Sequence, residues 1–109
     1  MSISASISAG VGSVSNDALP KNPINITAPV LSGTFTSGNT ISCSDGAWEN
    51  NPYIFTYQWY RDSIVIIGAE TSTYRLGSDD INKMINCLVI AENDFGKGLK
   101  FSNSVNITA

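Results

Sequence analysis

The sequence contains no histidine and few charged residues, and both absences narrow the range of functions. Histidine is the usual general base, the partner of serine and cysteine nucleophiles, and a common metal ligand, so the chain lacks the groups on which most hydrolytic and zinc chemistry depends. Six basic residues stand against nine acidic ones, and the basic residues are scattered rather than clustered. We therefore expect no enzyme, no cofactor and no nucleic-acid binding through a basic face.

Long apolar runs are also absent. The longest candidate, residues 64–67, is far shorter than the roughly 18 residues that a membrane helix requires. Residues 1–12 lack the positively charged start and the continuous apolar stretch of a secretory signal. We therefore expect a protein that does not span a membrane and that is made and used without export.

Cysteine is scarce, and acidic residues do not occur in a metal-binding pattern. Two cysteines can form one disulfide but not a disulfide scaffold, and no basic cluster is present to activate a thiol. Loop carboxylates that might bind calcium lack the spaced Asp-x-Asp pattern, so we expect them to cap turns and predict no metal site. These carboxylates are Asp79, Asp80, Glu92 and Asp94.

Short runs rich in Ile, Val, Thr, Tyr and Phe are separated by turn signals about every ten residues, and no run has a helical period. A chain of 109 residues is close to the usual size of one domain. The pattern predicts a single all-β sandwich or barrel. The expected strands are 29–35, 39–44, 53–61, 64–67, 72–76, 84–92 and 98–108.

Alternation within the predicted strands indicates which side chains face inward. We expect one inner set from residues 53–61, a second from residues 84–92, and additional members from other strands. The predicted core comprises Tyr53, Phe55, Tyr57, Trp59, Ile85, Cys87, Val89 and Ala91, together with Ile41, Cys43, Phe101, Val105 and Ile107.

Several motifs, taken in order, resemble the immunoglobulin-like domains of bacteriophage virion proteins and bacterial surface proteins. They are Pro29-Val30-Leu31-Ser32-Gly33, Gly46-Ala47-Trp48, Tyr57-Gln58-Trp59-Tyr60-Arg61-Asp62, Gly68-Ala69, Thr73-Tyr74-Arg75-Leu76, Asp80-Ile81-Asn82-Lys83 and Ala91-Glu92-Asn93-Asp94-Phe95-Gly96. The resemblance covers residues 29–109 and implies an immunoglobulin-like β-sandwich of about seven strands. Two positions depart from the family pattern: Asn82 replaces a glycine, and Ile85 replaces the tyrosine of a tyrosine corner.

The same resemblance implies that Cys43, Trp59 and Cys87 form the structural core, with both cysteines on facing strands near the tryptophan. The two sulfurs would then lie within reach of a disulfide, although a protein that folds in a reducing cytoplasm can keep them as buried thiols. Both redox states are consistent with the sequence.

Residues 1–28 differ from the remainder of the chain and are assigned to an N-terminal extended arm and linker. Ile3, Ile7 and Val11 alternate with serines and glycines, a strand-like period that buries too little apolar surface to fold alone. Three prolines between residues 20 and 29 favour an extended linker. The arm either pairs with a partner or is a disordered tail.

The face of the two central strands opposite to the core is more apolar than an exposed sheet face usually is. It carries Ile54 and Tyr60 on one strand and Met84, Leu88 and Ile90 on the other. We interpret Ile54, Tyr60, Leu88 and Ile90, together with Ile3, Ile7 and Val11, as candidate interaction residues. The N-terminal arm covers this face, or another subunit does, or it is an ordinary solvated face.

These observations and the resemblance lead to a functional expectation: a non-enzymatic structural protein of a bacteriophage particle, located in the virion and assembled in the host cytoplasm. The most favoured role is a capsid decoration or cement protein anchored through its N-terminal arm. Its partners would be other virion proteins, foremost the major capsid protein, and copies of itself. The alternatives are a tail or baseplate component, and an adhesion module that binds host-surface glycans through aromatics such as Trp48 and Tyr53.

Overall fold

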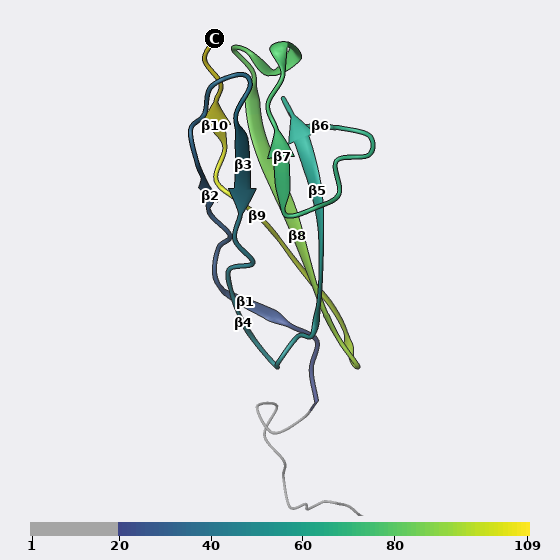
Figure 1. Ribbon diagram of the computed structural model, residues 1–109. Coiled ribbons are helices and arrows are strands. Elements are labelled where there is room, and N and C mark those ends of the chain that lie inside the picture. The colour runs from purple at the N-terminus through teal and green to yellow at the C-terminus, as the bar shows by residue number, and fades with distance from the viewer. Residues whose placement is uncertain (1–19) are drawn as a thin grey trace, which may run out of the picture.

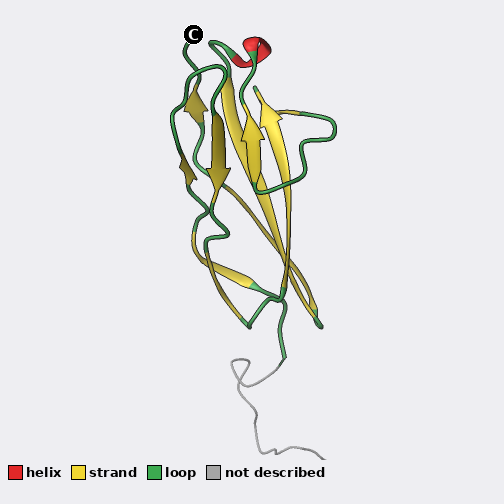
Figure 2. Ribbon diagram, in the orientation of Figure 1, coloured by secondary structure: helices red, strands yellow, loops and turns green. Residues whose placement is uncertain are grey.

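The computed structural model describes residues 20–109, which form an all-β chain with several antiparallel sheets (Figures 1 and 2). Residues 1–19 lie outside the described residues, and with them the predicted interaction residues Ile3, Ile7 and Val11. Within the described part, one short 3-10 helix, η2 (Ser78–Asp80), interrupts the strands.

The strands belong to three sheets. The largest has the order β10-β8-β5-β6, with β9 also paired to β8, and it comprises β5 (Ile54–Arg61), β6 (Ile64–Val65), β8 (Met84–Asn93), β9 (Gly96–Phe101) and β10 (Val105–Asn106). The second has the order β2-β3-β7 and comprises β2 (Leu31–Ser32), β3 (Thr40–Cys43) and β7 (Thr73–Arg75). The third pairs β1 (Ile24–Thr27) with β4 (Ala47–Glu49).

Strands β5 and β8 form the longest pairing, and their register places Trp59 opposite Cys87. Along β8 the side chains alternate strictly between buried and partly exposed positions, as expected for a strand with one face on the core. The hairpin from β8 to β9 turns at Asp94 and Phe95, between the paired residues Asn93 and Gly96, and the Asn93 side chain accepts a hydrogen bond from the Phe95 N–H. The period-2 pattern therefore sets the register of the central strands.

The core lies between the β2-β3-β7 sheet and the β5-β8 pair. Trp59 is fully buried, its indole N–H donates to the Thr71 carbonyl at 2.7 Å, and its ring stacks on Tyr74 with centroids 5.4 Å apart. Both sheets contribute fully buried side chains to this core, among them Ile41, Trp59, Ile85, Cys87 and Val89, and Ile107 joins them from just after β10.

Two of the predicted core residues lie elsewhere. Tyr53 precedes β5 and is 61% exposed, because the strand begins one residue later at the open end of the sheet. Phe101 is 45% exposed because the predicted strand 98–108 is two strands. Residues 102–104 interrupt the alternation, so Phe101 faces outward while Ile107 is buried, and the prediction of one continuous inner face was wrong.

Strands β1 and β4 are the elements that the sequence pattern did not predict. β1 lies within residues 1–28, which the sequence assigns to the arm and linker, and it pairs with β4 of the following domain. Pro23 and Pro29, the prolines on either side of β1, are buried. After β4 the chain reverses at Asn50 and Asn51, whose φ angles of 72° and 52° fall in the left-handed region that asparagine tolerates.

Candidate interaction surface

Apolar side chains gather on the face of the β5-β8-β9 sheet opposite to the core. The strand register sets Ile90 between Thr56 and Leu99, and sets Leu88 between Gln58 and Phe101. Residues directly opposite each other on neighbouring strands share a face, so Leu88, Ile90, Leu99 and Phe101 form a continuous apolar surface, and Ile54 and Tyr60 extend it diagonally on β5 to either side of Thr56 and Gln58. We call it the outer patch, and it consists of Ile54, Tyr60, Leu88, Ile90, Leu99 and Phe101.

The outer patch is accessible within the described chain. Leu99 is 58% exposed, Phe101 45% and Ile54 42%, whereas Tyr60, Leu88 and Ile90 are half-buried. The Tyr60 and Phe101 rings meet edge to face with centroids 5.2 Å apart. They border an open hollow of about 570 Å³ together with Leu88, Leu99 and Lys100. The patch is therefore a hollowed apolar surface rather than a set of isolated side chains.

The structure brings together all four predicted residues of this face that it describes, namely Ile54, Tyr60, Leu88 and Ile90. Sequence reasoning missed Leu99 and Phe101. The alternation of Lys97, Leu99 and Phe101 across a short hairpin from Leu88 and Ile90 was the available signal. It was overlooked because a single strand over 98–108 assigns Phe101 to the same face as Val105 and Ile107.

The cysteines lie in the core as buried thiols that interact with each other. The Cys87 side chain lowers the pKa of Cys43 by hydrogen bonding, whereas the same contact, together with burial, raises the pKa of Cys87. Nearby, the Tyr57 hydroxyl donates to Asp45, and burial followed by this hydrogen bond raises the pKa of Tyr57. These shifts accompany the packing of both thiols in the core.

Asp80, one of the carboxylates considered for calcium, has a structural role instead. It is fully buried and accepts from the Arg61 Nε at 2.7 Å, from the Tyr74 hydroxyl at 2.9 Å, and from the Gly77 N–H at 2.8 Å. The pKa of Arg61 is raised by its hydrogen bond to Asp80. The Asp80 carboxylate thereby anchors η2 to β5 and β7.

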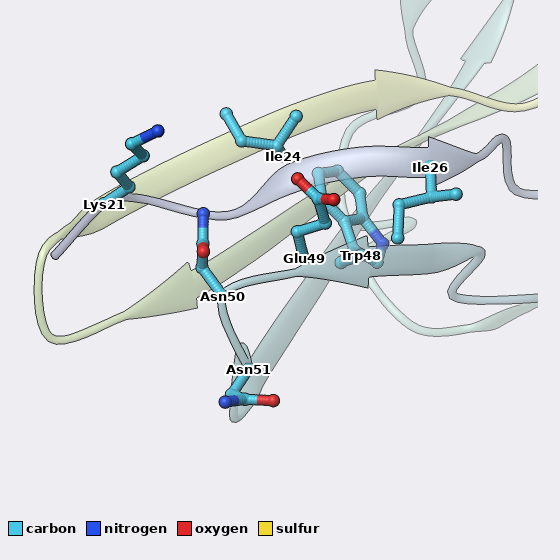
Figure 3. A pocket seen from close by; sticks show the side chains of 7 residues that line it. All are labelled: Lys21, Ile24, Ile26, Trp48, Glu49, Asn50 and Asn51. Atoms are coloured by element: carbon cyan, nitrogen blue, oxygen red, sulfur yellow. The ribbon is translucent and has the colours of Figure 1, made fainter. Parts of the chain in front are cut away.

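A second hollow, an open cleft of about 700 Å³, lies beside β1 and β4 (Figure 3). Its lining is Lys21, Ile24, Ile26, Trp48, Glu49, Asn50 and Asn51. The Trp48 indole N–H donates to the Asp45 carbonyl at 2.6 Å, and Trp48 also packs against the core. The Asn50 side chain also makes a hydrogen bond within the protein, because it donates to the Asn22 carbonyl. The aromatic residue of the cleft therefore serves mainly to join β4 to the sheets.

Three further findings concern the possible kinds of site. Across residues 20–109, no group of three or more His, Cys, Asp or Glu side chains is arranged to hold a metal ion. The same part of the chain has no helix long and apolar enough to cross a membrane. Tyr53, the second aromatic considered for glycan stacking, lies exposed next to the β8-β9 hairpin and donates to Asp94 at 2.6 Å.

In comparisons with known proteins, no family model, no curated protein and no solved structure matches the chain.

Proposed function

We propose that the chain is a non-enzymatic structural protein of a bacteriophage particle, a capsid decoration protein built on an immunoglobulin-like β-sandwich. The outer patch is the observation that supports this proposal most strongly. A contiguous apolar surface on a small protein favours contact with another macromolecule, since isolated apolar side chains are common on surfaces but continuous patches are not.

Support for the immunoglobulin-like sandwich comes from the resemblance of residues 29–109 and from the arrangement of the core. Cys43 in one sheet and Cys87 in the other meet beside Trp59, which is the order and placement that the family uses. In such a domain the sheets supply a rigid scaffold, so an apolar face can bind a neighbour without reorganisation.

The partner that fits the outer patch is another protein of the particle, with the major capsid protein as the first candidate. Aromatic and aliphatic residues occupy the centre of the patch, and charged residues such as Lys97, Lys100 and Glu92 lie at its margin. An apolar centre with a polar rim is the usual anatomy of a protein interface. Anchoring through the N-terminal arm remains part of the proposal.

The test is to prepare particles that lack this protein and particles that contain it, and to separate heads from tails. We expect mass spectrometry to assign the protein to heads, and we expect particles without it to release their genome at a lower temperature, because bound copies stabilise the assembled state by mass action. Assignment to tails would support the tail or baseplate alternative instead. Unchanged thermal release, with binding of the isolated protein to glycans, would support adhesion and contradict the decoration role.

A further inference from the structure

Strand β9 supplies part of the outer patch, and one of its edges is not hydrogen-bonded to any strand of residues 20–109, because β9 pairs with β8 alone and β1 packs against it without a ladder. In an antiparallel ladder, successive residues direct their N–H and C=O groups to alternate sides. The Ser102 N–H donates to the Cys87 carbonyl at 2.8 Å, which sets this alternation. Gly98 and Lys100 therefore bond to β8, whereas Leu99 and Phe101 direct their backbone groups toward the open edge.

Leu99 and Phe101 also carry the most exposed side chains of the outer patch. An edge strand that combines available backbone groups with apolar side chains is a template for the addition of another strand. At the end of β9 nearest the hairpin, the Lys97 carbonyl already accepts a hydrogen bond from the Asn22 side chain at 2.9 Å. The open edge of β9 therefore begins beside Lys97, where Asn22 contacts the sheet.

The path of the chain indicates that the strand added to the open edge of β9 comes from the same molecule. The Asn93 side chain donates to the Lys21 carbonyl at 2.9 Å, so residues 21 and 22 are held at the hairpin end of β9. Residues 12–20 can span up to about 30 Å when extended, which is enough chain to turn back at the hairpin end of β9. A segment that enters this turn at the hairpin end would run antiparallel to β9.

The sequence of residues 3–11 suits such a strand. Its odd-numbered positions are Ile3, Ala5, Ile7, Ala9 and Val11, and the even-numbered ones are serine or glycine. One face of the strand would be apolar and the other polar. We propose that residues 3–11 add to the open edge of β9 in the same chain, with Ile3, Ile7 and Val11 extending the outer patch.

Tethering favours this intramolecular pairing over pairing between copies, because a short linker gives the segment an effective concentration in the millimolar range. The inference rests on the proposed function in one respect: the enlarged patch would be the surface that meets the particle. It also gives the N-terminal arm and the outer patch a joint role, since both belong to one docking surface.

The experiment is amide hydrogen exchange on the full-length protein at several concentrations, compared with the Ile7→Asp variant. We expect the Leu99 and Phe101 amides to exchange at least about tenfold more slowly in the parent than in Ile7→Asp, because the substitution removes the apolar cross-strand contacts that Ile7 would make with the outer patch. The Gly98 and Lys100 amides, which bond to β8, serve as internal controls and should be protected in both. Ser8→Asp, on the polar face, should retain the protection.

Equally fast exchange of the Leu99 and Phe101 amides in parent and variant would overturn the inference. Protection that increases with protein concentration would also overturn it, because that result assigns the edge to a second copy. Binding to particles that lack the protein is measured separately. Binding by a parent with unprotected amides would refute only this inference, whereas protected amides without binding would refute only the proposed function.

Discussion

The inner and outer faces of the β5-β8 pair are built from alternate residues of the same two strands, yet their environments differ. On the inner face, Trp59, Cys87 and Val89 are fully buried between the sheets. On the outer face, Leu88 and Ile90 are half-buried and their neighbour Leu99 is largely exposed. Apolar side chains on the first face stabilise the fold, and those on the second remain available for binding.

The sharpest way to test this contrast is to truncate one aromatic on each face. Trp59→Ala should cost about 3–5 kcal/mol of unfolding free energy, as expected for loss of a fully buried aromatic, whereas Phe101→Ala should cost about 1 kcal/mol or less. Urea denaturation measures both values. Equal midpoints for Trp59→Ala and the parent would refute the assignment of Trp59 to the core.

The next largest effect should come from the buried carboxylate that joins η2 to the sheets. Asp80→Ala removes the acceptor for Arg61, Tyr74 and the Gly77 N–H, and should destabilise the protein by about 2–3 kcal/mol. Asp79→Ala changes the exposed neighbour and is the matched control. The structural role assigned to Asp80 fails if the two variants unfold at the same denaturant concentration.

A smaller effect is expected where the segment before β1 packs against β9. A Cβ at Gly98 would collide with the Pro23 carbonyl and lie 2.8 Å from Cζ3 of Trp48, so Gly98→Ala should cost about 1–3 kcal/mol. Gly77→Ala is a suitable control because a Cβ there meets nothing within 4 Å. Thermal unfolding of the two variants distinguishes them, and equal melting temperatures would indicate that the segment does not pack as described.

These comparisons also show how far the sequence predicts the structure. Period-2 alternation located the central strands and the buried positions of β8, because a strand with one face on a core must alternate. The outward orientation of Phe101 was not predicted, because the interruption at residues 102–104 breaks the alternation that a single strand over 98–108 assumes. The pairing of β1 with β4 was missed because both strands are short and neither alternates between buried and exposed side chains as a core strand does.

The candidate surface was predicted in part. Ile54, Tyr60, Leu88 and Ile90 follow from alternation alone, whereas Leu99 requires the β8-β9 register.

The smallest effect on stability is expected from a substitution at Leu99. Leu99→Ser should change the unfolding free energy by about 0.5 kcal/mol or less, because the side chain is already largely in solvent. Calorimetry would contradict the exposure of Leu99 if the loss were comparable to that of a core residue.

The most direct test of the central claim is the binding of purified variants to particles that lack this protein. Leu99→Asp places a charge in the outer patch, whereas Ile67→Asp places the same charge at an apolar residue that is 95% exposed and lies outside the patch. If the outer patch is the docking surface, Leu99→Asp should abolish binding while Ile67→Asp binds as the parent does, with both variants folded. Undiminished binding by Leu99→Asp would contradict the account.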